Sequence, residues 1–339
     1  MADGTAIEWT DATWNPITGC SVVSPGCKNC YAMRLAGARL RHDPSRAGLT
    51  HATKAGPVWT GEVRFNARWL DQPLRWRRPR RIFVCAHGDL FHEAVPDEWI
   101  DRIFRVMSTA PRHTFQVLTK RAERMRRYLS DPTVHGRIRY DARPPWPLPN
   151  VWLGVSVEDQ RRADERIPIL LDTPAAVRWI SAEPLLGPIS LAAIDVDGET
   201  EVLPLGAEWL GRSDEIEGLD LPRLDWVVAG GESGPNARPM HPDWARSLRD
   251  QCAAADVPFL WKQNGEFLPV SEAWGPTAAS PDDLRGCVFV DPNGITYRLR
   301  EAASFGAWAM RRVGKKAAGR LLDGVIHDAW PGGAPLTAG

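Results

Sequence analysis

Apolar and polar positions change along residues 81–265 in a regular rhythm of short buried runs and amphipathic stretches. Apolar runs within 81–86, 114–120, 150–159, 177–184, 224–234 and 258–265 predict buried strands. Helical spacing of apolar residues over 95–110, 121–130, 160–172 and 241–257 predicts helices between them. Because strands and helices alternate, we expect an α/β fold: a partial or full parallel (β/α) barrel of about six to seven βα units.

The expected barrel covers residues 1–265, and two segments depart from its rhythm: an insertion within the barrel and an extension after it. Residues 195–220 carry nine acidic side chains and one arginine, which predicts a solvated insertion. Residues 266–339 form an expected C-terminal extension that consists of a hairpin and a tail. In it, apolar runs flank Asp-Pro-Asn-Gly at 291–294, a strong signal for a β-hairpin.

The composition of the chain indicates where the protein is located but not which class of partner it binds. The chain has 42 basic and 42 acidic residues, so its formal net charge of zero favours no class of partner. No window approaches the roughly 18 consecutive apolar residues of a membrane helix, and the N-terminal stretch is acidic without an apolar core. We therefore expect a cytoplasmic protein with no membrane partner, in which a tight cysteine cluster binds metal or acts in redox chemistry.

Polar residues and glycines follow most of the predicted strands. In parallel α/β folds, ligands bind where the strands end, so these positions are candidates for a binding site, although helix caps and turns use the same residue types. The candidates are Asp89, Ser156, Glu158, Glu183, Gly230, Gly231, Glu232 and Lys262. The three glutamates are the least easily explained by turn chemistry alone.

Half of the six cysteines, Cys20, Cys27 and Cys30, lie within eleven positions. Structural zinc sites usually have four protein ligands, so a zinc site would need a histidine or Cys85 to complete it. An iron–sulfur cluster held by three thiolates leaves one iron open for a substrate or cofactor. The spacing predicts a metal site and leaves both possibilities open.

Three cysteines in an N-terminal loop before repeated βα units resemble the radical S-adenosylmethionine superfamily, although the first gap has six residues where that superfamily usually has three. More narrowly, TWNPITGC (13–20), SPGCKNCYA (24–32), DLFH (89–92), GGESG (230–234) and WKQNG (261–265) are similar to a phage-associated family of three-Cys-motif proteins without an established reaction.

The resemblance to the superfamily implies a 4Fe–4S cluster on Cys20, Cys27 and Cys30, with S-adenosylmethionine on the fourth iron. It implies that Asp89 binds the methionyl amine and that Ser156 and Glu158 face the ribose. Gly230, Gly231 and Glu232 would approach the adenine or the substrate. The implied reaction is reductive cleavage of S-adenosylmethionine and hydrogen abstraction from an unknown substrate, with electrons from a flavodoxin or ferredoxin. Cys85, as a hydrogen donor, and Lys262, as an anion-binding group, are candidates for the catalytic groups.

A basic segment suggests the class of substrate. Residues 64–81 contain seven arginines interleaved with Phe65, Trp69 and Trp76, and arginine with aromatic rings suits phosphate contact and base stacking. The segment therefore predicts nucleic acid as a substrate for modification or repair, with a solvated surface as the simpler reading. The alternative function is a non-catalytic zinc protein that binds nucleic acid through this segment.

Overall fold

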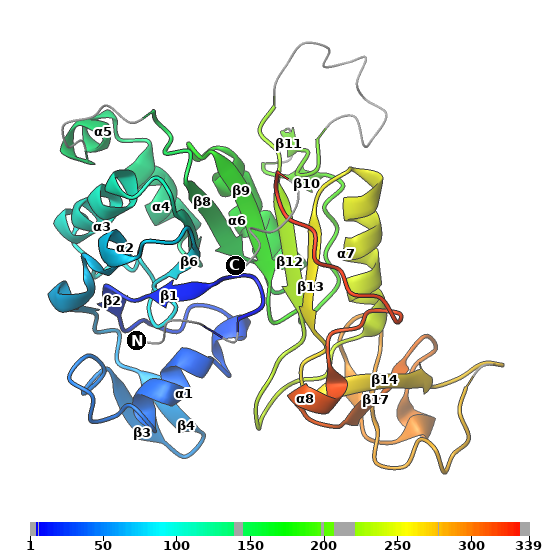
Figure 1. Ribbon diagram of the computed structural model, residues 1–339. Coiled ribbons are helices and arrows are strands. Elements are labelled where there is room, and N and C mark those ends of the chain that lie inside the picture. Colours follow the sequence, from blue (N-terminus) through cyan, green and yellow to red (C-terminus); the bar gives the residue numbers. More distant parts are fainter. Residues whose placement is uncertain are drawn as a thin grey trace. The chain divides into compact units, whose positions relative to one another are not determined.

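The computed structural model of the chain describes residues 5, 7–138, 145–197, 200–206, 221–276 and 278–332. These residues form two compact units. The first unit contains the residues up to Ser156 together with Arg166–Trp179, and the second contains Val157–Glu165 and the residues from Ile180 onward. Figure 1 labels most of the helices and strands of both units.

A seven-stranded sheet runs in the order β1-β6-β7-β8-β9-β12-β13, and β1 and β13 are its two ends. The pairs recorded within each unit, from β1 to β8 and between β12 and β13, are parallel. The prediction of a parallel α/β fold is confirmed, and the open strand order corresponds to the partial barrel. The strands are β1 (Ala12–Trp14), β6 (Arg81–Val84), β7 (Thr114–Thr119), β8 (Val151–Ser156), β9 (Val177–Ala182), β12 (Trp226–Gly230) and β13 (Phe259–Gln263).

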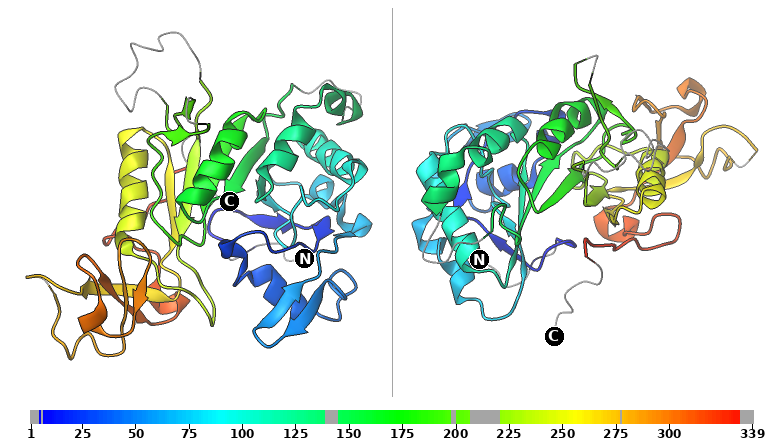
Figure 2. Two further views of the ribbon diagram at one scale, coloured as in Figure 1. Left: turned by 180° about the vertical axis from the view of Figure 1, so that it is seen from behind. Right: turned by 90° about the horizontal axis from the view of Figure 1, so that it is seen from above.

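Helices follow the strands as the apolar spacing predicts. In α3, the buried residues Ile100, Ile103, Phe104 and Met107 recur at helical spacing and form one apolar face. Helix α7 packs against β12 and β13 in the second unit (Figure 2). The helices that follow strands are α3 (Asp97–Thr109), α4 (Ala122–Leu129), α6 (Gln160–Leu171) and α7 (Pro242–Ala254). A further helix, α5 (Pro132–Ile138), follows α4 and was not predicted.

Buried side chains of the sheet strands form the core of the first unit. Trp14, Ile82, Phe115 and Val117 are fully buried, and the rings of Trp14 and Phe115 lie 5.8 Å apart. Because these strands are buried on both faces, their sequences are mainly apolar and do not alternate strictly between apolar and polar residues.

The N-terminal part of the first unit also contains elements outside the βα rhythm. Helix α1 packs against a two-stranded hairpin, and a second short pair joins residues more than 40 positions apart. These elements are β2 (Ile17–Thr18) paired with β5 (Arg64–Phe65), α1 (Tyr31–Gly37), the hairpin β3 (Thr50–Thr53) and β4 (Gly56–Trp59), and the short helix α2 (Gln72–Arg75).

The C-terminal extension contains the predicted hairpin, in which Phe289 pairs with Tyr297. The hairpin belongs to a four-stranded sheet in the order β14-β17-β15-β16. Of the acidic segment, residues 198–199 and 207–220 lie outside the described residues. The remaining elements are β10 (Ile194–Asp195), β11 (Glu201–Val202), β14 (Phe267–Glu272), β15 (Val288–Val290), β16 (Thr296–Tyr297), β17 (Trp308–Arg312) and α8 (Lys315–Ala318).

After α8, the chain returns to the last strand of the large sheet (red in Figure 1). Trp261 N donates to His327 O at 3.0 Å, and Ala329 N donates to Phe259 O at 3.2 Å. Asn264 fixes the start of this return, because its Nδ2 donates to Ala318 O at 2.9 Å and to Leu321 O at 3.1 Å. Residues 319–330 are called the return segment below.

None of the helices in the described part of the chain has the length and apolar character needed to cross a bilayer.

Candidate functional site

The cysteine loop, residues 20–30, begins at a glycine that no other residue can replace without strain. Gly19 has φ +95°, and a Cβ on it would lie 2.2 Å from Glu62 O. Gly19 N donates to His87 O at 3.1 Å, and Gly19 forms a parallel bridge with Gly88. The loop is therefore anchored beside the residues that follow β6, the edge at which parallel sheets bind ligands.

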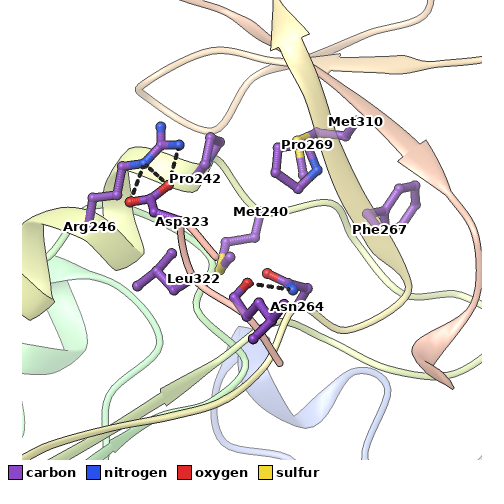
Figure 3. A pocket seen from close by; sticks show the side chains of 10 residues that line it. Met240, Pro242, Arg246, Asn264, Phe267, Pro269, Met310, Leu322 and Asp323 are labelled. Carbon is purple, nitrogen blue, oxygen red and sulfur yellow. Dashed lines mark hydrogen bonds and ion pairs between the residues drawn. The ribbon is translucent and has the colours of Figure 1, made fainter. Parts of the chain in front are cut away.

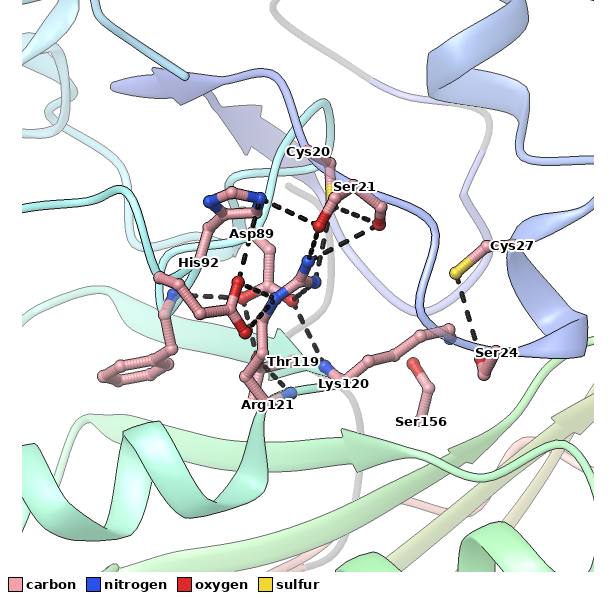
Figure 4. Close-up of polar contacts among 12 residues, drawn as sticks. Cys20, Ser21, Ser24, Cys27, Asp89, His92, Thr119, Lys120, Arg121 and Ser156 are labelled. Atoms are coloured by element: carbon pink, nitrogen blue, oxygen red, sulfur yellow. Dashed lines mark hydrogen bonds and ion pairs between the residues drawn. The ribbon is translucent and has the colours of Figure 1, made fainter. Parts of the chain in front are cut away.

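All three thiols of the loop are free, and each has its own polar contact. Arg121 Nη1 donates to Cys20 Sγ at 3.4 Å, and Ser24 Oγ lies 3.8 Å from Cys27 Sγ (Figure 4). Backbone amides of Met33 and Ala32 hydrogen-bond the Cys30 sulfur. Such contacts are typical of thiolates that carry negative charge at a metal centre.

Burial favours the protonated form of two of these thiols, Cys20 and Cys30. Burial, with the Asp89 carboxylate, raises the pKa of Cys20 to about 12 although Arg121 opposes it. Burial also raises the pKa of Cys30, against the Met33 amide and the charge of Lys120. Cys27 and Cys30 also contribute to the raised pKa of Cys20, and Cys27 contributes to that of Cys30. The three sulfurs therefore lie within electrostatic range of one another.

Arg121, at the start of α4, is the centre of the polar contacts around the loop (Figure 4). It is only 6 % exposed, and it donates to Ser21 Oγ at 2.7 Å and to Asp89 Oδ2 at 3.0 Å. Its Nε also donates to Glu93 Oε2 at 3.1 Å. Burial alone lowers the pKa of a guanidinium, but Asp89 and the neighbouring groups raise the pKa of Arg121 above its ordinary value. A permanent cation therefore contacts Cys20.

Asp89, which the resemblance assigns to amine binding, is 5 % exposed and accepts four hydrogen bonds from the chain. Oδ1 accepts from Phe91 N at 3.0 Å and from Thr119 Oγ1 at 2.7 Å. Oδ2 accepts from Lys120 N at 3.2 Å and from Arg121. Whatever else it binds, this carboxylate orients Arg121 and joins the end of β7 to the segment after β6.

The other candidates of the first unit are Cys85 and Ser156. Cys85 is buried with φ +57°, a left-handed conformation that few non-glycine residues adopt. Burial raises the pKa of its thiol far above the ordinary range, although the Ile17 amide contacts the sulfur. Ser156 ends β8, is buried, and accepts a hydrogen bond from Arg166 Nη1 at 2.6 Å through its backbone oxygen.

In the second unit, the structure brings Glu183 and Lys262 together. Lys262 Nζ lies 2.9 Å from Glu183 Oε1, and Ser181 Oγ donates to Glu183 Oε2 at 3.3 Å. Gly230 is next to this pair, because a Cβ on it would lie 3.0 Å from Glu183 Oε1. Glu158 is also completely buried in this unit. A paired, largely buried ammonium and carboxylate at strand ends form a polar centre in this unit.

The GGESG and WKQNG motifs pack against each other. A Cβ on Gly231 would lie 2.3 Å from Asn264 O, and one on Gly265 would lie 2.2 Å from Glu232 O. Glu232 in turn holds Arg238, with 2.6 Å between Oε1 and Nη2. Close approach of two backbones thus accounts for Gly231 and Gly265 without a ligand.

Much of the basic segment is engaged within the chain. Arg64 donates to Pro44 O at 2.5 Å and to Ala47 O at 2.8 Å, and Arg81 forms a two-point ion pair with Asp11. The guanidinium groups of Arg68 and Arg80 lie 4.7 Å and 5.0 Å from the ring centroids of Trp69 and Trp76. The sequence predicts that the arginines and tryptophans of this segment stack on nucleic-acid bases. In the structure, some of these arginines stack on tryptophans of the chain itself.

The second unit contains a hollow whose lining includes none of the predicted site residues. Met240, Phe267, Met310 and Leu322 give it an apolar lining (Figure 3). Arg246 and Asp323 form an ion pair beside it, with 2.7 Å between Nη2 and Oδ1. Asn264 also lines this hollow, and its side chain holds the return segment through the bond to Leu321 O.

Sequence reasoning missed Ser21, His92 and Arg121 as members of the site. In the sequence, Arg121 stands among basic residues at the start of the predicted helix 121–130, and His92 lies in the DLFH motif, of which only Asp89 is assigned a role. The sequence does contain a signal for His92, because it lies only three residues after Asp89 in the same segment after a predicted strand. Within the described ranges, no three His, Cys, Asp or Glu side chains are grouped so that they could hold one metal ion.

Comparison with known proteins identifies a family but no reaction. A family model described as "Protein of unknown function (DUF5131)" matches residues 4–331. No curated protein matches the chain. No solved structure matches it either.

Proposed function

Since the chain belongs to the DUF5131 family of proteins of unknown function, we propose its function from the site: an iron–sulfur enzyme of the radical S-adenosylmethionine type. Cys20, Cys27 and Cys30 would hold a 4Fe–4S cluster, and S-adenosylmethionine would be its second cofactor. When bound, the reduced cluster supplies the electron that cleaves S-adenosylmethionine.

The observation that carries this proposal is the environment of the three thiols. Each sulfur has a hydrogen-bonding partner, and the charge of Arg121 acts on Cys20 while that of Lys120 acts on Cys30. Metal binding requires the thiols to lose their protons. These two cations lower the free energy of the resulting thiolates, and the donor set has the three soft ligands that an open cluster needs.

The chain's own groups have separate tasks in this proposal. Arg121 stabilises negative charge at Cys20, and Asp89 fixes the orientation of Arg121 through the 3.0 Å contact. Lys262, held by Glu183, remains the candidate for an anionic part of a substrate. We name no substrate, because Arg64 and Arg81 of the basic segment bind groups of the chain itself.

The test is anaerobic purification followed by iron and zinc analysis, and by electron paramagnetic resonance after reduction with dithionite. We expect about four irons per chain and a spectrum that changes when S-adenosylmethionine is added. Cys20→Ser and Cys27→Ser should lower the iron content, since each removes one thiolate ligand. Cys252→Ser is the matched control, because Cys252 is a buried thiol of α7 outside the loop.

A different outcome would support the alternative. Stoichiometric zinc, with no iron even after anaerobic reconstitution with iron and sulfide, would contradict the proposal and leave a zinc protein without this chemistry.

A further inference from the structure

The hydroxyl of Ser21, the residue after the first cysteine of the loop, is contacted by two buried nitrogen atoms. Arg121 Nη2 lies 2.7 Å from Ser21 Oγ, and His92 Nε2 lies 3.0 Å from it (Figure 4). Arg121 is 6 % exposed and His92 is 4 % exposed, whereas Ser21 is half-buried. The two nitrogens are fixed by the protein, and the serine is accessible.

Both nitrogens must be hydrogen-bond donors. A guanidinium has donors only. The Nδ1 atom of His92 accepts a hydrogen bond from Ala94 N at 3.1 Å, so the ring proton of the neutral imidazole is on Nε2. Burial and the charge of Arg121 lower the pKa of His92, which favours this neutral form. His92 therefore donates to Ser21 Oγ, as Arg121 does.

These two contacts determine what Ser21 can still do. A serine hydroxyl has one O–H donor and two acceptor positions, and Arg121 and His92 fill both acceptor positions. Among the described residues, no acceptor receives the Ser21 proton. The hydroxyl is thus left with a single function, donation, in the direction away from Arg121 and His92.

We propose that Ser21 is a positioning residue that donates a hydrogen bond to an anionic acceptor beside Cys20. This inference rests on the proposed function, which supplies two such acceptors: a sulfide of the cluster and the carboxylate of S-adenosylmethionine. An anion is the preferred acceptor, because the Arg121 cation that contacts Ser21 polarises its O–H bond and hydrogen bonds to charged groups are the stronger ones.

The DLFH motif, residues 89–92, contributes two side chains to this arrangement. Asp89 orients Arg121, and His92, three residues later, completes the two donors that fix the Ser21 hydroxyl. One short segment after β6 thereby controls the residue next to the first cysteine.

The experiment compares the anaerobically reconstituted wild type with two variants. Ser21→Ala removes the hydroxyl, and Ser21→Thr keeps it. Ser108→Ala is the matched control, since its hydroxyl bonds Arg105 O within α3. Iron content is measured first. Then the midpoint potential of the cluster is measured without S-adenosylmethionine, and the dissociation constant of S-adenosylmethionine is measured by equilibrium dialysis.

If the acceptor is a sulfide, Ser21→Ala lowers the midpoint potential, because the lost hydrogen bond had stabilised the more negative, reduced cluster. If the acceptor is the carboxylate, Ser21→Ala weakens S-adenosylmethionine binding by about tenfold or more and leaves the potential unchanged. In both cases Ser21→Thr restores the wild-type value and Ser108→Ala has no effect. Loss of iron in Ser21→Ala, restored in Ser21→Thr, would also support the proposal.

A Ser21→Ala protein with full iron content, an unchanged potential and an unchanged dissociation constant would overturn this inference and leave the proposed function intact. Loss of iron in both Ser21 variants would overturn it too, because the site would then respond to packing rather than to the hydroxyl. A wild type that never binds iron would overturn the proposed function and this inference together.

Discussion

Replacing Asp89 with alanine tests the arrangement of the site independently of any cofactor. The change removes the carboxylate that accepts from Phe91 N, Thr119 Oγ1, Lys120 N and Arg121 Nη1. Arg121 would keep Glu93, whose side chain is 63 % exposed. A cation that is 6 % exposed would thus lose its only buried counter-charge among the described residues.

The expected loss of stability follows from this burial. Removing one partner of a buried ion pair costs about 3–5 kcal/mol, because the remaining charge stays desolvated. Since both partners are at least nine-tenths buried, we expect a loss of about 4 kcal/mol for Asp89→Ala. That loss lowers the ratio of folded to unfolded protein by about a thousandfold.

The assay is urea unfolding at neutral pH, followed by circular dichroism and by tryptophan fluorescence. Asp172→Ala is the matched control, because Asp172 also pairs with an arginine, Arg126, at 2.7 Å but is 67 % exposed. We expect this control to lose less than about 1 kcal/mol. Asp89→Ala/Arg121→Ala removes both charges and should cost less than the sum of the two single variants.

Two results would refute this reasoning. One is an Asp89→Ala variant within about 1 kcal/mol of the wild type, the range of an exposed pair. The other is strict additivity in the double variant, since additivity would mean that Asp89 and Arg121 do not stabilise each other in the folded protein.

Two further predictions concern packing and pH. Gly231→Ala places a carbon 2.3 Å from Asn264 O and should lose about 2 kcal/mol, whereas Gly136→Ala in α5, with nothing within 4 Å, should be neutral or slightly stabilising. Thermal unfolding compares them, and equal midpoints would contradict the packing argument. Burial raises the pKa of the Asp11 carboxyl, but the hydrogen bonds and charge of Arg81 together hold it below 3.8, and Asp11→Asn removes this carboxylate. The wild type should therefore be the more stable above pH 3.8 and lose that advantage as the pH falls through the folded pKa; urea midpoints at several pH values check this, and a constant difference would speak against it.

The sequence predicted the strands and helices that have strong local patterns. Six of the seven strands of the large sheet lie in mainly apolar stretches of the sequence, and α3 has a buried apolar face. Strand β1 was not predicted, because Ala12–Trp14 has only three residues and its pairing partner β6 begins at Arg81. A strand of that length has no period to detect, and only its distant partner defines it.

Arg121 shows why the site was harder to predict than the fold. In the sequence it belongs to a run of basic residues, which usually form a solvated face. In the structure it is buried because Asp89, 32 positions away, and Ser21, 100 positions away, surround it. No local pattern contains those distances. The three cysteines, by contrast, are neighbours in sequence, and the structure keeps them within electrostatic range of one another.

The return segment has a consequence for how the protein behaves at high concentration. Strand β13 is an end of the large sheet, and an end strand offers unpaired amide and carbonyl groups to other molecules. The return segment fills part of that edge from within the chain, through the 3.0 Å and 3.2 Å bonds of Trp261 and Ala329 and an antiparallel bridge between Leu260 and Asp328. Shortening the chain before residue 319 would therefore open a strand edge to intermolecular pairing and would promote aggregation.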